Sequence, residues 1–129
     1  MNLLFDTHSF LWWNDSPQML PQRVLSACQD TRNQLFLSVV SAWEIQIKQQ
    51  IGKLNMQSPL AEVIERQVQV NRLRILPVRI EHILAIEHLP LLHRDPFDRL
   101  LIAQAITETP TLISRDSFIQ QYSLTTLWA

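Results

Sequence analysis

Residues 93–99 read His-Arg-Asp-Pro-Phe-Asp-Arg and open the helix around which the chain is organised. Asp95 suits an N-cap, and Pro96 suits the first helical position, where no N–H is needed. Asp98 then falls in the first turn, on the same side as Asp95. The helix that follows, Asp98 to Ile106, is apolar on most sides, which predicts a core helix. Its two carboxylates therefore lie at the edge of the interior, where they either cap the helix only or hold a cation.

The length and composition indicate one globular domain spanning residues 1–129. Hydrophobic residues make up 47% and charged residues 18%, as in ordinary globular proteins. No apolar run approaches the roughly 18 residues that span a bilayer, and the N-terminus lacks the basic region of a signal peptide. Cys28 is the only cysteine, which excludes an internal disulfide and a thiolate-rich zinc site. We therefore expect a cytoplasmic protein that does not engage a membrane.

Glycine content and net charge exclude two further classes of protein. Gly52 is the only glycine, whereas the phosphate loops of nucleotide-binding proteins need several close together, so no nucleotide cofactor is expected. The formal net charge of −1 excludes passive binding of nucleic acid through a broad basic face. Chemistry on a nucleic acid would need a local site with a metal.

Short apolar runs alternate with helical patterns along the chain. The expected strands are residues 2–5, 34–38, 74–78, 111–114 and 124–128, and expected helices include residues 9–14, 21–30, 59–71, 81–88, 98–106 and 117–121. In the helix after the second strand, Ser41 and Glu44 form a capping-box pattern, and Gly52 suits the end of that helix. The alternation predicts an α/β fold with a mainly parallel central sheet flanked by helices.

Acidic residues follow the expected strands. Asp6 comes directly after the first strand, Glu44 after the second and the first turn of helix, and Asp116 shortly after the fourth. Ligands of such sheets sit beyond the carboxyl ends of the strands, so these acids would gather at one edge with Asp98 of the core helix. Each acid also has a purely structural explanation, as a cap or as a favourable charge at a helix start. Four acids directed to one edge are less easily explained by capping alone.

A divalent cation would relieve the repulsion among these acids. Two carboxylates about 4 Å apart repel by roughly 4 kcal/mol at an effective dielectric near 20. Oxygen ligands without cysteine or clustered histidine suit Mg²⁺ or Mn²⁺ rather than zinc. One or two such ions would activate water and stabilise the attacking and leaving oxygens of a phosphodiester.

Other polar and aromatic residues are less informative. His8 and His93 lie near the expected site, and Arg94, Arg99 and Arg115 flank acids, where they would bind phosphate or form ion pairs. His82 and His88 are expected to be surface residues, and Trp12, Trp13 and Trp43 are expected to be core residues, with Trp12 or Trp13 also suited to line a partner groove.

At this point the motifs resemble those of a known family, the PIN domain. The shared residues are Asp6-Thr7 after the first strand, Ser41-x-x-Glu44, Asp-Arg-Leu-Leu-Ile-Ala at 98–103, and Ser114-Arg115-Asp116. Three sequence motifs resemble those of VapC-type toxins of bacterial toxin–antitoxin pairs. They are Asp-Thr-His-x-x-Leu-Trp-Trp at 6–13, Trp-Glu-Ile at 43–45 with Lys48 and Gly-Lys-Leu at 52–54, and residues 93–99. The resemblance runs from Leu3 to Trp128, and the order and spacing of the motifs make it specific.

The resemblance implies a PIN-like three-layer sandwich and a Mg²⁺- or Mn²⁺-dependent endoribonuclease. It places the family's acids on Asp6, Glu44, Asp98 and, more variably, Asp116, whereas Asp95 matches an acid found in only part of the family. It also implies an RNA substrate, a homodimer and a cognate VapB-like antitoxin that lies across the active-site groove. Two alternatives stay open: a non-catalytic binding or regulatory module, and a nuclease that acts on DNA. A phosphatase or receiver domain ranks low, because the late strand ends in Ser-Arg-Asp rather than in a lysine.

Overall fold

A computed structural model describes residues 1–91 and 95–129, and it is built around a parallel five-stranded sheet. The strands are β1 (Asn2–Phe5), β2 (Gln34–Ser38), β3 (Arg74–Leu76), β4 (Thr111–Ile113) and β5 (Thr126–Leu127). Their order is β3-β2-β1-β4-β5, and each neighbouring pair is parallel. The predicted parallel sheet is therefore confirmed, with β1 at its centre. The strand β3 ends two residues earlier than expected, and β5 is shorter than expected at both ends.

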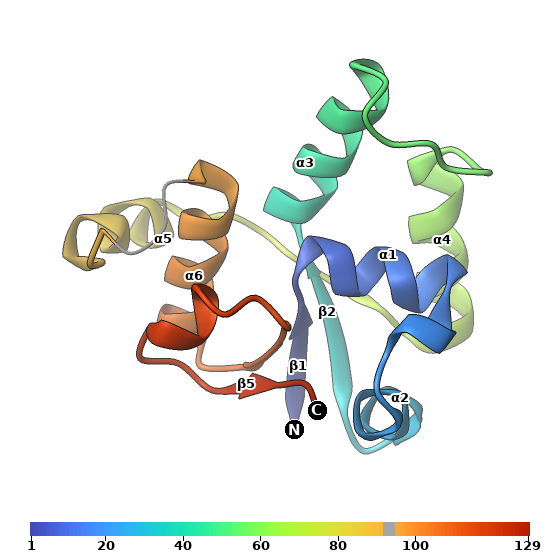
Figure 1. Cartoon of the computed structure of the whole chain (residues 1–129), viewed down its shortest axis with the longest axis horizontal. Coiled ribbons are helices and arrows are strands. Elements are labelled where there is room, and N and C mark those ends of the chain that lie inside the picture. Colours follow the sequence, from blue (N-terminus) through green and yellow to red (C-terminus); the bar gives the residue numbers. More distant parts are fainter. Residues whose placement is uncertain (92–94) are drawn as a thin grey trace.

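The helices cover both faces of this sheet. They are α1 (Thr7–Asp15), α2 (Gln22–Gln29), α3 (Val39–Gln50), α4 (Leu60–Asn71), α5 (Ile80–Ala85) and α6 (Pro96–Glu108), with short 3₁₀ turns η1 (Pro17–Met19), η2 (Ile86–His88) and η3 (Ile119–Gln121). Figure 1 shows α5 and α6 on one side of the strands and α1, α2 and α4 on the other, with α3 rising from the end of β2. The three-layer α/β architecture predicted from the sequence is confirmed.

Alternating side chains of β1 divide the interior into two cores. Leu3 and Phe5 pack in the core beneath α1, α2 and α4, whereas Leu4 packs in the core formed with α6. Consecutive side chains of a strand point to opposite faces, so a strand covered on both sides must be apolar at every position. All three side chains are 0% exposed, and this explains why the run predicted as a strand carries no alternation of polar residues.

The helix α6 is the buried helix expected from the opening stretch. It begins at Pro96, with Asp95 as its N-cap, and it ends at Glu108, before Thr109 takes a left-handed conformation with φ 57°. Residues 101–105 are all buried. Among them, the Gln104 side chain bonds to the Ser38 hydroxyl and donates to the Pro77 carbonyl over 3.1 Å, which joins α6 to the carboxyl ends of β2 and β3. These contacts fix α6 against the sheet.

Three local expectations are wrong. The helix α3 starts at Val39 with Ser38 as its N-cap, not at Ser41, because β2 runs into the helix without a loop and the Ser38 hydroxyl accepts the Val40 N–H over 3.0 Å. Trp43 is 57% exposed rather than a core residue. His82 is fully buried rather than at the surface, because α5 packs that side chain against α6, where it contacts Glu108.

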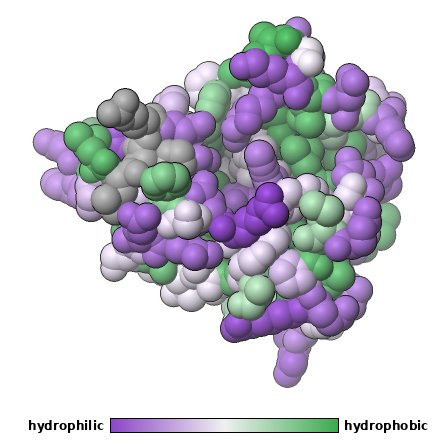
Figure 2. All heavy atoms as spheres, in the orientation of Figure 1, coloured by the Kyte–Doolittle hydropathy of each residue, from purple (hydrophilic) through white to green (hydrophobic). Residues whose placement is uncertain are grey.

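The exposed surface combines polar residues with large hydrophobic ones such as Val70, Ile80 and Leu91. In the orientation of Figure 1, hydrophilic residues run across the middle of the visible face, between the α6 side and the α1 side (Figure 2). Within the part of the chain that the structure describes, no helix has both the length and the apolar character needed to cross a membrane.

Candidate functional site

A pocket of about 540 Å³ lies beyond the carboxyl ends of the strands. Its lining comprises Asp6, Thr7, His8, Trp12, Glu44, Lys48, Asp95, Asp98, Arg115, Asp116, Ser117 and Phe118. The five acids singled out from the sequence all line this pocket, although they come from four separate parts of the chain. The topology explains their meeting, because β1, β2 and β4 are adjacent and parallel and therefore deliver their following residues to the same edge.

Asp6 joins β1 to α1 and is only 8% exposed. It is the N-cap of α1, and its Oδ1 accepts the Ser9 N–H over 2.9 Å. The Oδ2 atom accepts no hydrogen bond from the residues that the structure describes. The capping function expected for Asp6 is therefore present, but it occupies one carboxylate oxygen and leaves the other for a ligand.

Glu44 projects from α3 and is 5% exposed. The Thr7 hydroxyl donates to Oε1 over 2.6 Å, and the Lys48 ammonium donates to Oε2 over 2.8 Å from the next turn of α3. An unpaired carboxylate at this depth would be strongly destabilising, and these two donors supply a hydrogen bond to each of its oxygens. Sequence analysis assigned no role to Lys48 or Thr7. The i,i+4 spacing could have indicated Lys48 as the partner of Glu44, whereas nothing local indicates a contact between residues 7 and 44.

Asp95 and Asp98 occupy the start of α6. Asp95 Oδ1 accepts the N–H groups of Phe97 over 2.8 Å and Asp98 over 3.1 Å, so the predicted N-cap is confirmed. Asp98 lies in the first turn, partly buried, and lines the pocket. Because the following turns are packed in the core, the position of Asp98 is set by the fold rather than by a loop.

Asp116 follows β4 in a short turn. The Ser114 hydroxyl accepts the Asp116 N–H over 3.0 Å, and Asp116 Oδ1 in turn accepts the Phe118 N–H over 2.8 Å. A longer contact of 3.4 Å reaches the Ile119 N–H at the start of η3. These contacts hold the Asp116 carboxylate at the rim of the pocket, where it is half-buried.

An aromatic and cationic wall closes one side of the pocket. The Arg115 guanidinium carbon lies 4.6 Å from the centre of the Trp12 ring, and the His8 ring meets Trp12 edge-on at 6.0 Å. Phe118, which sequence analysis did not consider, is 53% exposed and lines the same pocket. Aromatic side chains beside a charged groove are the usual platforms for single-stranded bases.

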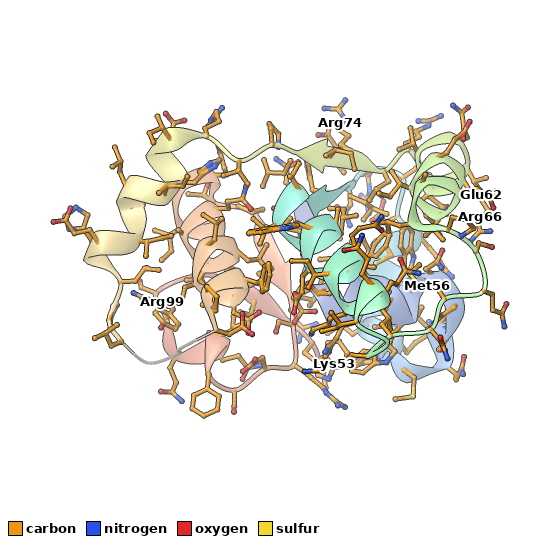
Figure 3. The ribbon with its side chains drawn as sticks, turned by 90° about the horizontal axis from the view of Figure 1, so that it is seen from above. Lys53, Met56, Glu62, Arg66, Arg74 and Arg99 are labelled. Atoms are coloured by element: carbon orange, nitrogen blue, oxygen red, sulfur yellow. The ribbon has the colours of Figure 1, made fainter. Side chains whose placement is uncertain are left out.

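The predicted arginines do not all reach the pocket. Arg115 lines it, but Arg99 is absent from the lining, and its Nε is buried without a hydrogen-bond partner among the described residues. Figure 3 shows Arg99 on the side of α6 that faces α5, away from α1 and α3. Its expected contact with phosphate is therefore not supported by the geometry. Arg94 and His93 lie outside the described residues.

The donors in the pocket fit a hard divalent cation. Among the described lining residues they are mainly carboxylate oxygens, with no thiolate and with His8 as the one imidazole. Among the described residues, no three of these carboxylates bring oxygens within 4.8 Å of one another. Mg²⁺ and Mn²⁺ suit this open arrangement, because Mg²⁺ is commonly held by one or two carboxylates and keeps several waters.

A tighter group of donors occurs elsewhere, between α5 and α6. Glu81, His82 and Glu108 have ligand atoms within 4.8 Å of one another. However, Arg79 pairs with both glutamates, and the Arg79 N–H donates to His82 Nδ1 over 2.9 Å. His82 Nε2 then carries the proton and donates to Glu108 over 3.1 Å, so neither imidazole nitrogen is open to a metal. The group is a buried structural network.

Comparison with known proteins identifies the family. The sequence model of the PIN domain matches residues 3–123. The chain belongs to the PIN domain family. The resemblance noted in the sequence is thus confirmed, and PIN domains are generally nucleases.

Two solved structures share the fold of this PIN domain over its whole length. VapBC2 from Rickettsia felis, bound to a DNA fragment from its promoter, has a chain with a TM-score of 0.72 and 16% identity, with complete coverage of both chains. VapBC-1 from nontypeable Haemophilus influenzae has a chain with a TM-score of 0.61 and 17% identity, covering 98% of this chain and 97% of that one. No protein among curated sequences matches the chain significantly.

Proposed function

We propose that this PIN domain is a VapC-type endoribonuclease that hydrolyses RNA phosphodiester bonds with Mg²⁺ or Mn²⁺. The observation that carries the proposal is the single pocket that gathers Asp6, Glu44, Asp98 and Asp116 from distant parts of the chain. Capping explains one oxygen of Asp6 and of Asp116, but it does not explain why all four acids share a cavity. A divalent cation does explain it, because it offsets their mutual repulsion.

In the proposed mechanism the carboxylates have distinct tasks. Asp6 and Asp98 would hold the ion directly, since both sit on elements anchored in the core. Glu44 and Asp116 would add negative charge beside the ion and help to orient the attacking water, and Asp95 contributes mainly by holding the first turn of α6. When bound, the ion supplies Lewis-acid activation of water and stabilisation of charge on the phosphate.

The cationic and aromatic residues of the same pocket suggest contacts with the substrate. Arg115 and His8 face the same cavity as the acids, so they are suited to neutralise phosphates on either side of the scissile bond. Trp12 and Phe118 offer ring faces to unpaired bases, which favours single-stranded RNA over a duplex. Arg94 stays a candidate by sequence, whereas Arg99 points to the other side of α6.

The same proposal extends to partners. Because both structural neighbours are VapBC proteins, we propose a cognate VapB-like antitoxin that covers the pocket, a homodimeric toxin and a cytoplasmic location. An acidic pocket fits a partner segment that brings a basic side chain into it.

Cleavage assays on paired substrates test this function. Purified protein is incubated with a broad set of single-stranded RNAs and with DNAs of the same sequences, in Mn²⁺ or Mg²⁺, with and without a chelator. We expect chelator-sensitive cleavage of RNA at internal positions. Cleavage of DNA alone would assign the chain to the DNA nucleases, and binding without cleavage across the RNA set would indicate a regulatory module.

A further inference from the structure

Lys48 is a partly buried cation in the lining of the acidic pocket. Its Nζ is 2.8 Å from Glu44 Oε2, and its side chain is 36% exposed, against 7% for that of Glu44. The other lining cation with a permanent charge, Arg115, is exposed and lies over the Trp12 ring. The lysine therefore pairs directly with one of the two buried acids of the pocket.

The two buried acids of the pocket, Glu44 and Asp6, differ in how many of their carboxylate oxygens are available to bind a metal. Both carboxylate oxygens of Glu44 already accept a hydrogen bond, one from Thr7 and one from Lys48. Asp6 uses only Oδ1, for the Ser9 N–H. A divalent ion at Asp6 finds an oxygen available, whereas a second ion at Glu44 would have to displace the ammonium or accept its repulsion at close range.

We propose that the Lys48 ammonium takes the place of a second divalent ion, so that the pocket binds one Mg²⁺ or Mn²⁺ on the Asp6 side. The inference rests on the metal site of the proposed function and specifies its stoichiometry. Lys48 is a positioning residue: its 2.8 Å ion pair holds the Glu44 carboxylate in place, and its ammonium supplies a second positive charge to the cavity without a second metal. Because Lys48 and Arg115 both line the pocket, a phosphate that entered it with one ion bound would meet three positively charged groups.

Counting bound Mn²⁺ tests the proposal without any cleavage assay. Isothermal titration, together with the loss of the free-Mn²⁺ electron paramagnetic resonance signal, measures the number of ions per chain. Wild type and Lys48→Arg are expected to bind one ion, and Lys48→Met two, because Glu44 is then open. Lys53→Met is the matched control, because it removes the only other lysine of the sequence. Lys53 is exposed and lies beyond the end of α3, outside the pocket (Figure 3). This control variant is expected to bind one ion.

A double variant completes the test and guards against misfolding. Glu44→Gln combined with Lys48→Met removes the ion pair as a neutral unit, so no buried charge is left unpaired. It should bind one Mn²⁺ with a smaller loss of affinity than Asp6→Asn, which should weaken that ion by more than tenfold, because Glu44 adds only charge to the pocket whereas Asp6 offers an available oxygen. Two ions in the wild type, one ion in folded Lys48→Met, or a double variant weakened as much as Asp6→Asn would each overturn the inference. A wild type that binds no Mn²⁺ would instead remove the metal-dependent function itself.

Discussion

Asp95 lines the pocket and also caps α6, so its variants can distinguish a contribution to helix stability from a contribution to metal binding. Its Oδ1 accepts two backbone N–H groups, from Phe97 and Asp98. Replacing an N-cap by alanine costs typically about 1 kcal/mol, and a negative charge at a helix start contributes about 0.3–1 kcal/mol more. Asp95→Ala should therefore lower the free energy of unfolding by about 1.5 kcal/mol. Asp95→Asn keeps the cap and loses only the charge, so we expect a loss of about 0.5 kcal/mol.

Urea denaturation in metal-free buffer measures both variants. With a slope of about 2 kcal/mol per molar urea, the midpoint of Asp95→Ala should fall by about 0.7 M, and that of Asp95→Asn by about 0.2 M. Mn²⁺ affinity of Asp95→Asn should stay within about threefold of wild type, because the carboxylate acts mainly as a cap. Equal midpoints for the two variants would refute the capping account, and a tenfold loss of Mn²⁺ affinity in Asp95→Asn would show that this acid is a ligand.

Two further predictions concern buried groups. Thr7→Val keeps the side-chain shape but removes the donor 2.6 Å from Glu44 Oε1, so it should lower the free energy of unfolding by about 1–3 kcal/mol. The control Thr31→Val, at an exposed position, should change the free energy of unfolding by less than about 0.5 kcal/mol. Equal urea midpoints for the two variants would contradict this prediction. Burial raises the pKa of the Cys28 thiol from 9.0 to about 12, so iodoacetamide at pH 8.5 should label the folded protein at least about 100-fold more slowly than the urea-unfolded chain. The stability associated with the neutral thiol should be full below pH 9 and should decline as the pH rises toward 12. Equal labelling rates would show that the thiol is not desolvated.

The parts of the structure that depend on local pattern were predictable from the sequence. The β1 run is apolar at each position from Leu3 to Phe5 because both of its faces are covered, and that continuous pattern distinguishes a central parallel strand. Asp95 followed by Pro96 marks the start of α6 because the cap and the missing N–H act within one turn. The convergence of Asp6, Glu44 and Asp116 follows in turn from parallel strand order.

The errors arose where distant residues override a local pattern. Ser41 and Glu44 have the spacing of a capping box, but Thr7 and Lys48 take both oxygens of Glu44, and the contact with Thr7 joins residues 37 positions apart. Arg99 follows Asp98 directly, yet consecutive helical residues point about 100° apart, so one lines the pocket and the other does not. His82 is buried because α5 packs on α6, which no pattern within its own six-residue helix reveals.

The most direct test of the account is RNA cleavage by two aspartate variants measured side by side. Asp6→Asn changes a buried pocket acid, and Asp15→Asn changes an exposed aspartate at the end of the same helix, α1, so the two variants have the same charge change. With Mn²⁺ and single-stranded RNA, we predict that Asp15→Asn cleaves as wild type does and that chelator stops it, whereas Asp6→Asn, folded by circular dichroism, loses cleavage by at least about 1,000-fold. Undiminished, chelator-sensitive cleavage by folded Asp6→Asn would contradict the assignment of this pocket as the nuclease site.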